Sequence, residues 1–61
     1  MKFTLRSAKN DPVKTFVSDD GFYKIIKRPT SKYILMSVNL FNIMGTEIGE
    51  FDTFEEAAES V

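Results

Sequence analysis

Apolar and polar residues alternate along much of the chain, a pattern typical of β-strands with one buried face. The longest apolar-rich run, residues 32–41, predicts a central strand, and residues 22–28 predict its neighbour. Pro29 favours a turn between these two strands, because its ring presets the backbone torsion at the first central position of a turn. Residues 42–45 predict a second turn and residues 46–51 a third strand, which gives an antiparallel three-stranded meander.

The side chains of the central strand divide between two faces. The more apolar set, expected to face the core, is Ile34, Met36, Val38 and Leu40. The set expected on the uncovered face is Tyr33, Leu35, Ser37 and Asn39. This division decides which apolar side chains a partner would meet.

The first twenty residues carry a weaker alternation, which predicts two further strands at residues 2–6 and 13–18. Turn-forming residues bound the second of them, with Asn-Asp-Pro at 10–12 and Asp-Asp-Gly at 19–21. The pattern leaves open whether residues 1–20 extend the sheet or cover its open face.

The C-terminal segment predicts a short helix. Thr53 and Glu56 have the spacing of a capping box, in which each side chain bonds the backbone N–H of the other residue. An apolar stripe at helical spacing consists of Phe54, Ala57, Ala58 and Val61. A helix of about eight residues is unstable alone, so it must pack against the sheet. The expected fold class is therefore α+β, a small antiparallel sheet, with or without an extension by N-terminal strands, packed against one C-terminal helix.

A chain of 61 residues is expected to form one small domain, residues 1–61, in which residues 22–61 make a βββα unit. Hydrophobic residues make up 43% of it, enough for a compact core. It contains no cysteine, which fits a reducing compartment, and a cytoplasmic location is expected. No run approaches the roughly 20 apolar residues of a membrane span, so no membrane partner is expected.

Charge is unevenly distributed, although the net charge is only −1. Residues 1–32 carry a net charge of +5, whereas residues 33–61 contain no Lys or Arg and carry −6. We expect an acidic helix surface and a more basic opposite side, an asymmetry that steers charged partners.

Residues 22–58 resemble the AP2/ERF DNA-binding domain and the related arm-type DNA-binding domains of phage integrases. The matching pieces are Lys-Arg-Pro-Thr-Ser-Lys-Tyr at 27–33, similar to that family's basic hairpin, and Gly-Glu-Phe-Asp-Thr-Phe-Glu-Glu-Ala-Ala at 49–58, similar to its strand-to-helix junction. The resemblance implies a three-stranded sheet backed by a helix, with the exposed sheet face in the DNA major groove. The residues at matching basic or aromatic positions are Arg28, Lys32 and Tyr33.

The chain contains neither histidine nor cysteine, so the usual general bases, nucleophiles and soft metal ligands are absent. Asp19 and Asp20 precede a glycine and are expected to form a turn rather than an acid–base pair. So short a chain also offers little room for the pocket of roughly 300–1,000 Å³ that is typical of a small-molecule site. We therefore expect a protein that is not an enzyme and that uses no cofactor and no metal.

Two functions fit this description. The first is a protein-binding regulator or inhibitor, of the accessory kind common in phages and mobile elements, with an apolar patch on the uncovered sheet face. The residues expected to form this patch are Tyr33 and Leu35, with Tyr23 or Ile26 depending on register. The alternative to partner binding is burial of the patch by the N-terminal segment or by a sheet-on-sheet homodimer.

The second function is nucleic-acid binding by a basic cluster with an aromatic residue, through phosphate contacts and base stacking. The residues concerned are Lys24, Lys27, Arg28, Lys32 and Tyr33. A sequence pI of 5.2 is low for such a module. The protein partner is therefore the first expectation and the nucleic acid the second.

Overall fold

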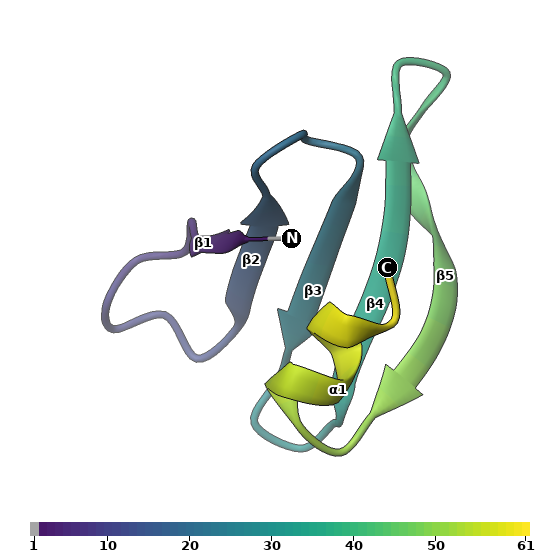
Figure 1. Cartoon of the computed structure of the whole chain (residues 1–61). Coiled ribbons are helices and arrows are strands. Elements are labelled where there is room, and N and C mark those ends of the chain that lie inside the picture. Colours follow the sequence, from purple (N-terminus) through teal and green to yellow (C-terminus); the bar gives the residue numbers. More distant parts are fainter. Residues whose placement is uncertain (1) are drawn as a thin grey trace.

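The computed structural model describes residues 2–61 and places them in one antiparallel sheet with one short helix (Figure 1). The elements are β1 (Phe3–Leu5), β2 (Lys14–Ser18), β3 (Tyr23–Lys27), β4 (Tyr33–Asn39), β5 (Asn42–Phe51) and α1 (Phe54–Glu59). The strands pair in the order β1-β2-β3-β4-β5, so each lies beside its neighbours in the sequence. The fold class α+β is confirmed. The N-terminal strands extend the predicted meander to five strands instead of covering it.

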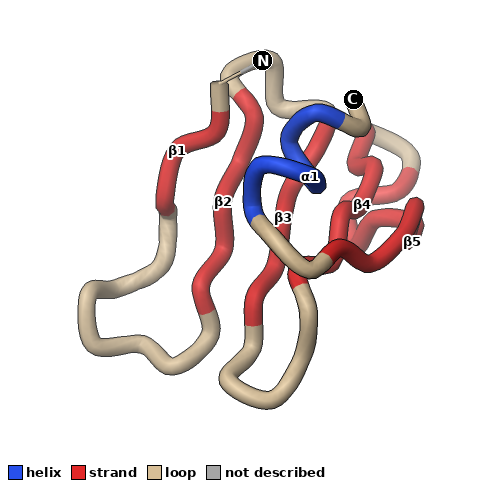
Figure 2. Tube along the Cα trace, turned by 60° about the horizontal axis from the view of Figure 1, so that its bottom comes forward, coloured by secondary structure: helices blue, strands red, loops and turns tan. Residues whose placement is uncertain are grey.

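The helix packs against β3, β4 and β5 on one side of the sheet, the helix-covered face (Figures 1 and 2). Leu35 of β4 lies directly opposite Ile25 of β3, and both are fully buried. Ala57 of the helix is also fully buried against them. These three side chains form the centre of the core, and the small alanine lets the helix lie close to the sheet.

Phe54, the first residue of α1, connects the helix to distant strands of the sheet. Its ring centroid lies 4.8 Å from that of Phe16 on β2 and 6.1 Å from that of Phe3 on β1. The ring of Tyr33 on β4 is also 6.1 Å away. Aromatic pairs are favourable at such separations, so Phe54 holds the N-terminal and central strands under the same helix.

The predicted faces of the central strand are reversed in the structure. Leu35 is fully buried beneath the helix, and Tyr33 packs against the same core. The residues expected in the core lie on the opposite, uncovered face of β4 and are partly exposed: Ile34, Met36 and Val38. Because β4 carries apolar side chains on both faces, alternation separates the two sets without showing which one is buried.

The hairpin between β4 and β5 turns earlier than the sequence predicts. Asn39 pairs with Asn42, which leaves Leu40 and Phe41 as the turn. The Asn39 side-chain oxygen accepts from the backbone N–H groups of Phe41 and Asn42, each over 2.8 Å. Residues 42–45, predicted as the turn, instead begin β5, where Gly45 has a φ of +87° beside an irregularity in the pairing. Gly45 therefore marks a bulge in the strand.

The helix begins as predicted but is shorter. The Thr53 hydroxyl accepts from the backbone N–H of Glu56 over 3.2 Å, which is one half of the predicted capping box. The reciprocal bond, from the N–H of Thr53 to the Glu56 carboxylate, is absent from the part of the chain that the structure describes. The helix ends at Glu59, so Val61 lies beyond it and is 38% exposed.

Candidate functional site

The residues predicted to bind a protein partner do not form one exposed patch. Leu35 is fully buried, and Tyr23 and Tyr33 pack against the core on the helix-covered face. Ile26 lies on the uncovered face, opposite Ile34 of β4, and is partly exposed. The prediction that Tyr33 and Leu35 lie on the uncovered face is therefore wrong, and the exposed apolar surface must be sought elsewhere.

The largest exposed apolar side chains gather at the end of the β4–β5 hairpin. Leu40 is 93% exposed, Phe41 101%, Ile43 78% and Met44 81%. We call these four residues the hairpin tip. It projects beyond the rest of the sheet, away from the helix N-terminus (Figure 1). Single exposed apolar residues are normal on a protein surface, but a contiguous group of them marks an interaction site.

The hairpin tip also lies within an uncharged stretch of the chain. Residues 33–46 contain no Asp, Glu, Lys or Arg. Sequence patterns do not reveal this site, because Asn42 and Gly45 indicate an ordinary turn and the alternation along residues 32–41 places Leu40 in the core. The signal that could have revealed it is the density of large apolar residues within a segment that also carries turn residues.

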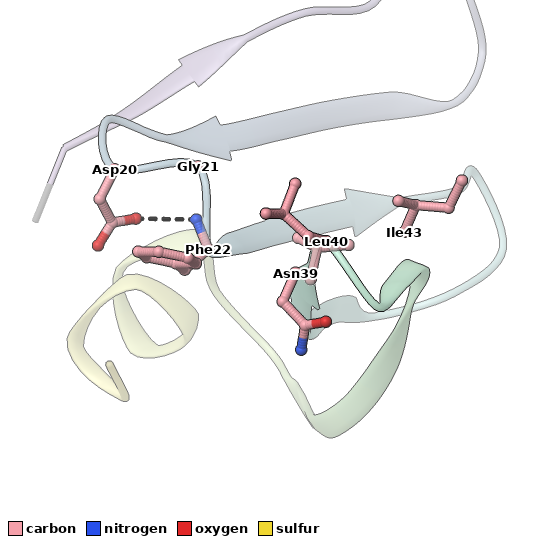
Figure 3. Close-up of a pocket in the computed structure, with 7 residues that line it drawn as sticks. Asp20, Gly21, Phe22, Asn39, Leu40 and Ile43 are labelled. Carbon is pink, nitrogen blue, oxygen red and sulfur yellow. Dashed lines mark hydrogen bonds between the residues drawn. The ribbon is translucent and has the colours of Figure 1, made fainter.

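An open groove with a volume of about 470 Å³ lies beside the hairpin tip. Phe22 stands on one side, with Leu40 and Ile43 on the other (Figure 3). The residues that line it are Asp20, Gly21, Phe22, Val38, Asn39, Leu40 and Ile43. Its volume falls within the range of roughly 300–1,000 Å³ seen for ligand sites, but the groove is largely open to solvent and is not an enclosed pocket.

A hydrogen-bonded turn between β2 and β3 forms the polar rim of this groove. The Ser18 hydroxyl donates to the Asp20 carboxylate over 2.6 Å, and the backbone N–H of Phe22 donates to the same oxygen over 3.0 Å (Figure 3). The Ser18 hydroxyl also accepts from the backbone N–H of Tyr23 over 3.0 Å. The Ser18 bond, and then the Phe22 bond, hold the pKa of Asp20 below its ordinary value. This confirms the prediction that the aspartates form a turn.

The basic residues gather at the opposite end of the sheet. Lys14 of β2 lies directly opposite Lys27 of β3, where like charges repel. The Lys14 ammonium donates to the carbonyl of Lys9 over 2.9 Å, and the Lys27 ammonium donates to that of Arg28 over 2.6 Å. The Lys27 ammonium also lies 5.8 Å from the ring centroid of Tyr33, within the range of a cation–π contact. Lys27, Arg28 and Tyr33 are thus neighbours, as the nucleic-acid hypothesis requires.

The other two predicted basic residues are less available to a polyanion. Lys32 forms an ion pair of 3.3 Å with Asp52. Lys24 lies on the uncovered face, between Val17 and Met36 in the strand register. The acidic helix surface is present, since Glu55, Glu56 and Glu59 are exposed. Opposite the helix, Lys24 lies on the uncovered face, whereas Lys14 and Lys27 pair at one end of the sheet.

Comparison with protein-family models, curated proteins and solved structures gives no match. The resemblance to AP2/ERF and arm-type domains therefore stays a prediction. Within residues 2–61, no helix has the length and apolar character needed to cross a bilayer. Nor do three or more His, Cys, Asp or Glu side chains cluster there in an arrangement suited to a metal ion.

Proposed function

We propose that this protein is a non-catalytic binding module that docks on a protein partner through the hairpin tip, and so acts as a small regulator or inhibitor. One observation carries the proposal: four large apolar side chains within residues 40–44 are 78–101% exposed. Burying one such side chain contributes about 1.5–3 kcal/mol, so the chain forgoes a sizeable stabilisation in the free state. A partner that covers the tip recovers it.

The construction of the hairpin supports a docking role. The side-chain oxygen of Asn39 binds two backbone N–H groups of the turn, and the Asn42 side-chain oxygen accepts from the N–H of Gly45 over 3.1 Å. The Asn42 amide donates to the Thr46 hydroxyl over 2.8 Å. Polar side chains thus fix the backbone while the apolar ones point outward. A preorganised hairpin loses less conformational entropy when a partner binds.

The chemistry of the chain supports binding rather than catalysis. Neither histidine nor cysteine occurs in it. The carboxylate at the groove, Asp20, has a lowered pKa because of its bonds to Ser18 and Phe22, which suits a structural acceptor and not a general acid. We infer that its role is to hold the turn beside the groove.

The experiment that tests this function is site-specific photo-crosslinking in an extract of the source cells. Phe41 is replaced by p-benzoylphenylalanine, a benzophenone derivative of the residue it replaces, and the control places the same group at the exposed helix position Glu55. We expect one protein to be crosslinked from position 41 and not from position 55. The purified partner should then bind the Leu40→Ser variant at least about tenfold more weakly than the wild type.

Two results would contradict the proposal. One is the same crosslinking pattern from positions 41 and 55, which would indicate random collision. The other is an unchanged affinity of the purified partner for Leu40→Ser. The Ile48→Ser variant is the matched control, since Ile48 is an apolar residue of β5 that is 50% exposed and lies outside the tip.

Nucleic-acid binding at the basic end is the second candidate, supported by the adjacency of Lys27, Arg28 and Tyr33. It is tested by fluorescence anisotropy of labelled DNA and RNA at about 50 and 200 mM salt, between which phosphate-driven binding collapses. If this candidate holds, Arg28→Glu weakens binding strongly and Lys24→Gln, on the other face, weakens it less. Absence of binding at the lower salt concentration would remove it.

A further inference from the structure

We propose that the hairpin tip pairs with a second copy of this chain, with Phe41 of each copy in the groove beside the tip of the other. The inference rests on the proposed function, because it names the protein that the tip contacts. Phe41 is fully exposed and does not line its own groove. The groove lies at the same end of the molecule as the tip, so a two-fold axis there lets each copy donate Phe41 and receive it.

The groove has room for an aromatic side chain, and most of its large side chains are apolar. Its walls include Phe22, Val38, Leu40 and Ile43, and its volume of about 470 Å³ exceeds what one phenyl ring needs. Phe22 is itself 56% exposed and presents its ring to the groove. An entering Phe41 would therefore meet an aromatic ring on one side and aliphatic side chains on the other.

The charges of the chain favour a second copy over a lipid surface. Residues 33–46 are uncharged and the net charge is only −1, so two copies meet without strong repulsion. A loop that inserts into an anionic membrane is flanked by Lys and Arg. Among the residues that line the groove, the charged one is Asp20, and no Lys or Arg lines it. Lys24 lies opposite Met36, between the two ends of β4, and Lys27 and Arg28 lie at the far end, roughly 20 Å away at 3.3 Å per residue.

The available area predicts a weak dimer. Phe41 offers roughly 150–250 Å², and with the three other tip residues each copy presents roughly 600 Å². Two copies would bury about 1,200 Å², the lower limit for a specific interface. We therefore expect dissociation at micromolar to millimolar concentrations, with a monomer as the dilute form.

The test is a dilution series of the full chain followed by NMR, supported by sedimentation equilibrium. Between about 1 mM and about 10 μM, we expect concentration-dependent shifts confined to the amides of residues 20–22 and 38–44. A mixed sample of labelled and unlabelled chains should show intermolecular contacts from the Phe41 ring to Phe22 and Ile43. Leu40→Ser/Phe41→Ser should remain monomeric, and Ile48→Ser should still dimerise.

The contrary outcomes separate this inference from the proposed function. A wild-type chain that stays monomeric at about 1 mM, yet crosslinks another protein from position 41, overturns self-pairing and leaves the proposed function standing. A dimer that persists in Leu40→Ser/Phe41→Ser, or that Ile48→Ser alone disrupts, places the contact on the β5 edge and overturns the inference. Binding of the monomer to phosphatidylcholine–phosphatidylglycerol vesicles through Phe41 would show that the hairpin tip binds lipid, and this result overturns both proposals.

Discussion

The backbone N–H of Val38 donates to the carbonyl of Phe22 over 2.8 Å. This bond extends the β3–β4 ladder one pair beyond Tyr23 and Ser37. It ties the β2–β3 turn, which carries Phe22, to the base of the hairpin tip. The two walls of the groove are therefore held together by the sheet itself, and their spacing depends on the conformation of the turn around Asp20.

The first prediction concerns pH. Because the pKa of Asp20 is lowered in the folded state, the stability that its bonds contribute is present above the ordinary value of about 3.9 and is lost as pH falls through the lower folded value. The Phe22 amide, observed by NMR, should titrate with a midpoint below about 3.9.

Two variants test the cause of this shift. Asp20→Asn should abolish the titration seen at Phe22. Ser18→Ala should move the midpoint upward, since the Ser18 hydroxyl is the strongest influence on the pKa of Asp20. A wild-type midpoint at or above about 3.9 would show that these hydrogen bonds do not persist in solution.

The second prediction compares one substitution at two leucines. Leu35→Ala should destabilise the fold by about 2–5 kcal/mol, because it opens a cavity between Ile25 and Ala57. Leu40→Ala should change the free energy of unfolding by no more than about 0.5 kcal/mol, because Leu40 is 93% exposed. Urea denaturation measures both.

The core of a domain of this size rarely supplies more than roughly 3–5 kcal/mol of stability, so Leu35→Ala can unfold it outright. Ile25→Val is the milder test and should cost about 0.5–1.5 kcal/mol. Ile43→Val, at a tip residue that is 78% exposed, is its matched control. Equal costs for the two valine variants would contradict the assignment of core and surface.

The third prediction concerns the aromatic contacts of the helix. Phe54→Ala should cost about 3–5 kcal/mol and leave the chain largely unfolded, because Phe54 contacts Phe3, Phe16 and Tyr33. Phe54→Leu retains apolar volume and should remain folded with a lower thermal midpoint. Phe41→Ala removes the same side chain from the exposed tip and should leave the midpoint nearly unchanged, as circular dichroism can show.

The fourth prediction separates the two halves of the capping box. Thr53→Ala should destabilise the chain by about 1 kcal/mol, because it removes the acceptor for the N–H of Glu56. Glu56→Ala should have a smaller effect, since the Glu56 carboxylate does not bond the N–H of Thr53 in the structure. A loss from Glu56→Ala as large as that from Thr53→Ala would mean that the reciprocal bond forms in solution.

The elements of the fold could be predicted from local patterns, because strand alternation, turn residues and the helix cap act over a few residues. The faces of β4 could not. Ile34 and Leu35 are adjacent apolar residues of β4, so the sequence alone does not show which side chain is buried. Leu35 is the buried one, because it pairs with Ile25 and packs under Ala57.

The candidate site could not be predicted for a related reason. The turn falls at Leu40 and Phe41, which have no special turn preference, and it depends on the side chain of Asn39. Gly45, which the sequence suggests as a turn residue, instead lies at a bulge in β5. A shift of the turn by a few residues exposes side chains that alternation assigns to the core.

Leu35 is buried beneath the helix, and Leu40 is exposed at the hairpin tip. The proposed docking surface is therefore the hairpin tip and not the sheet face. Solvent paramagnetic relaxation of the two leucine methyl groups tests this in a single NMR spectrum of a dilute sample. We predict strong broadening of the Leu40 methyl signals by a soluble gadolinium chelate and little broadening for Leu35. Equal broadening, or the reverse order, would contradict the account.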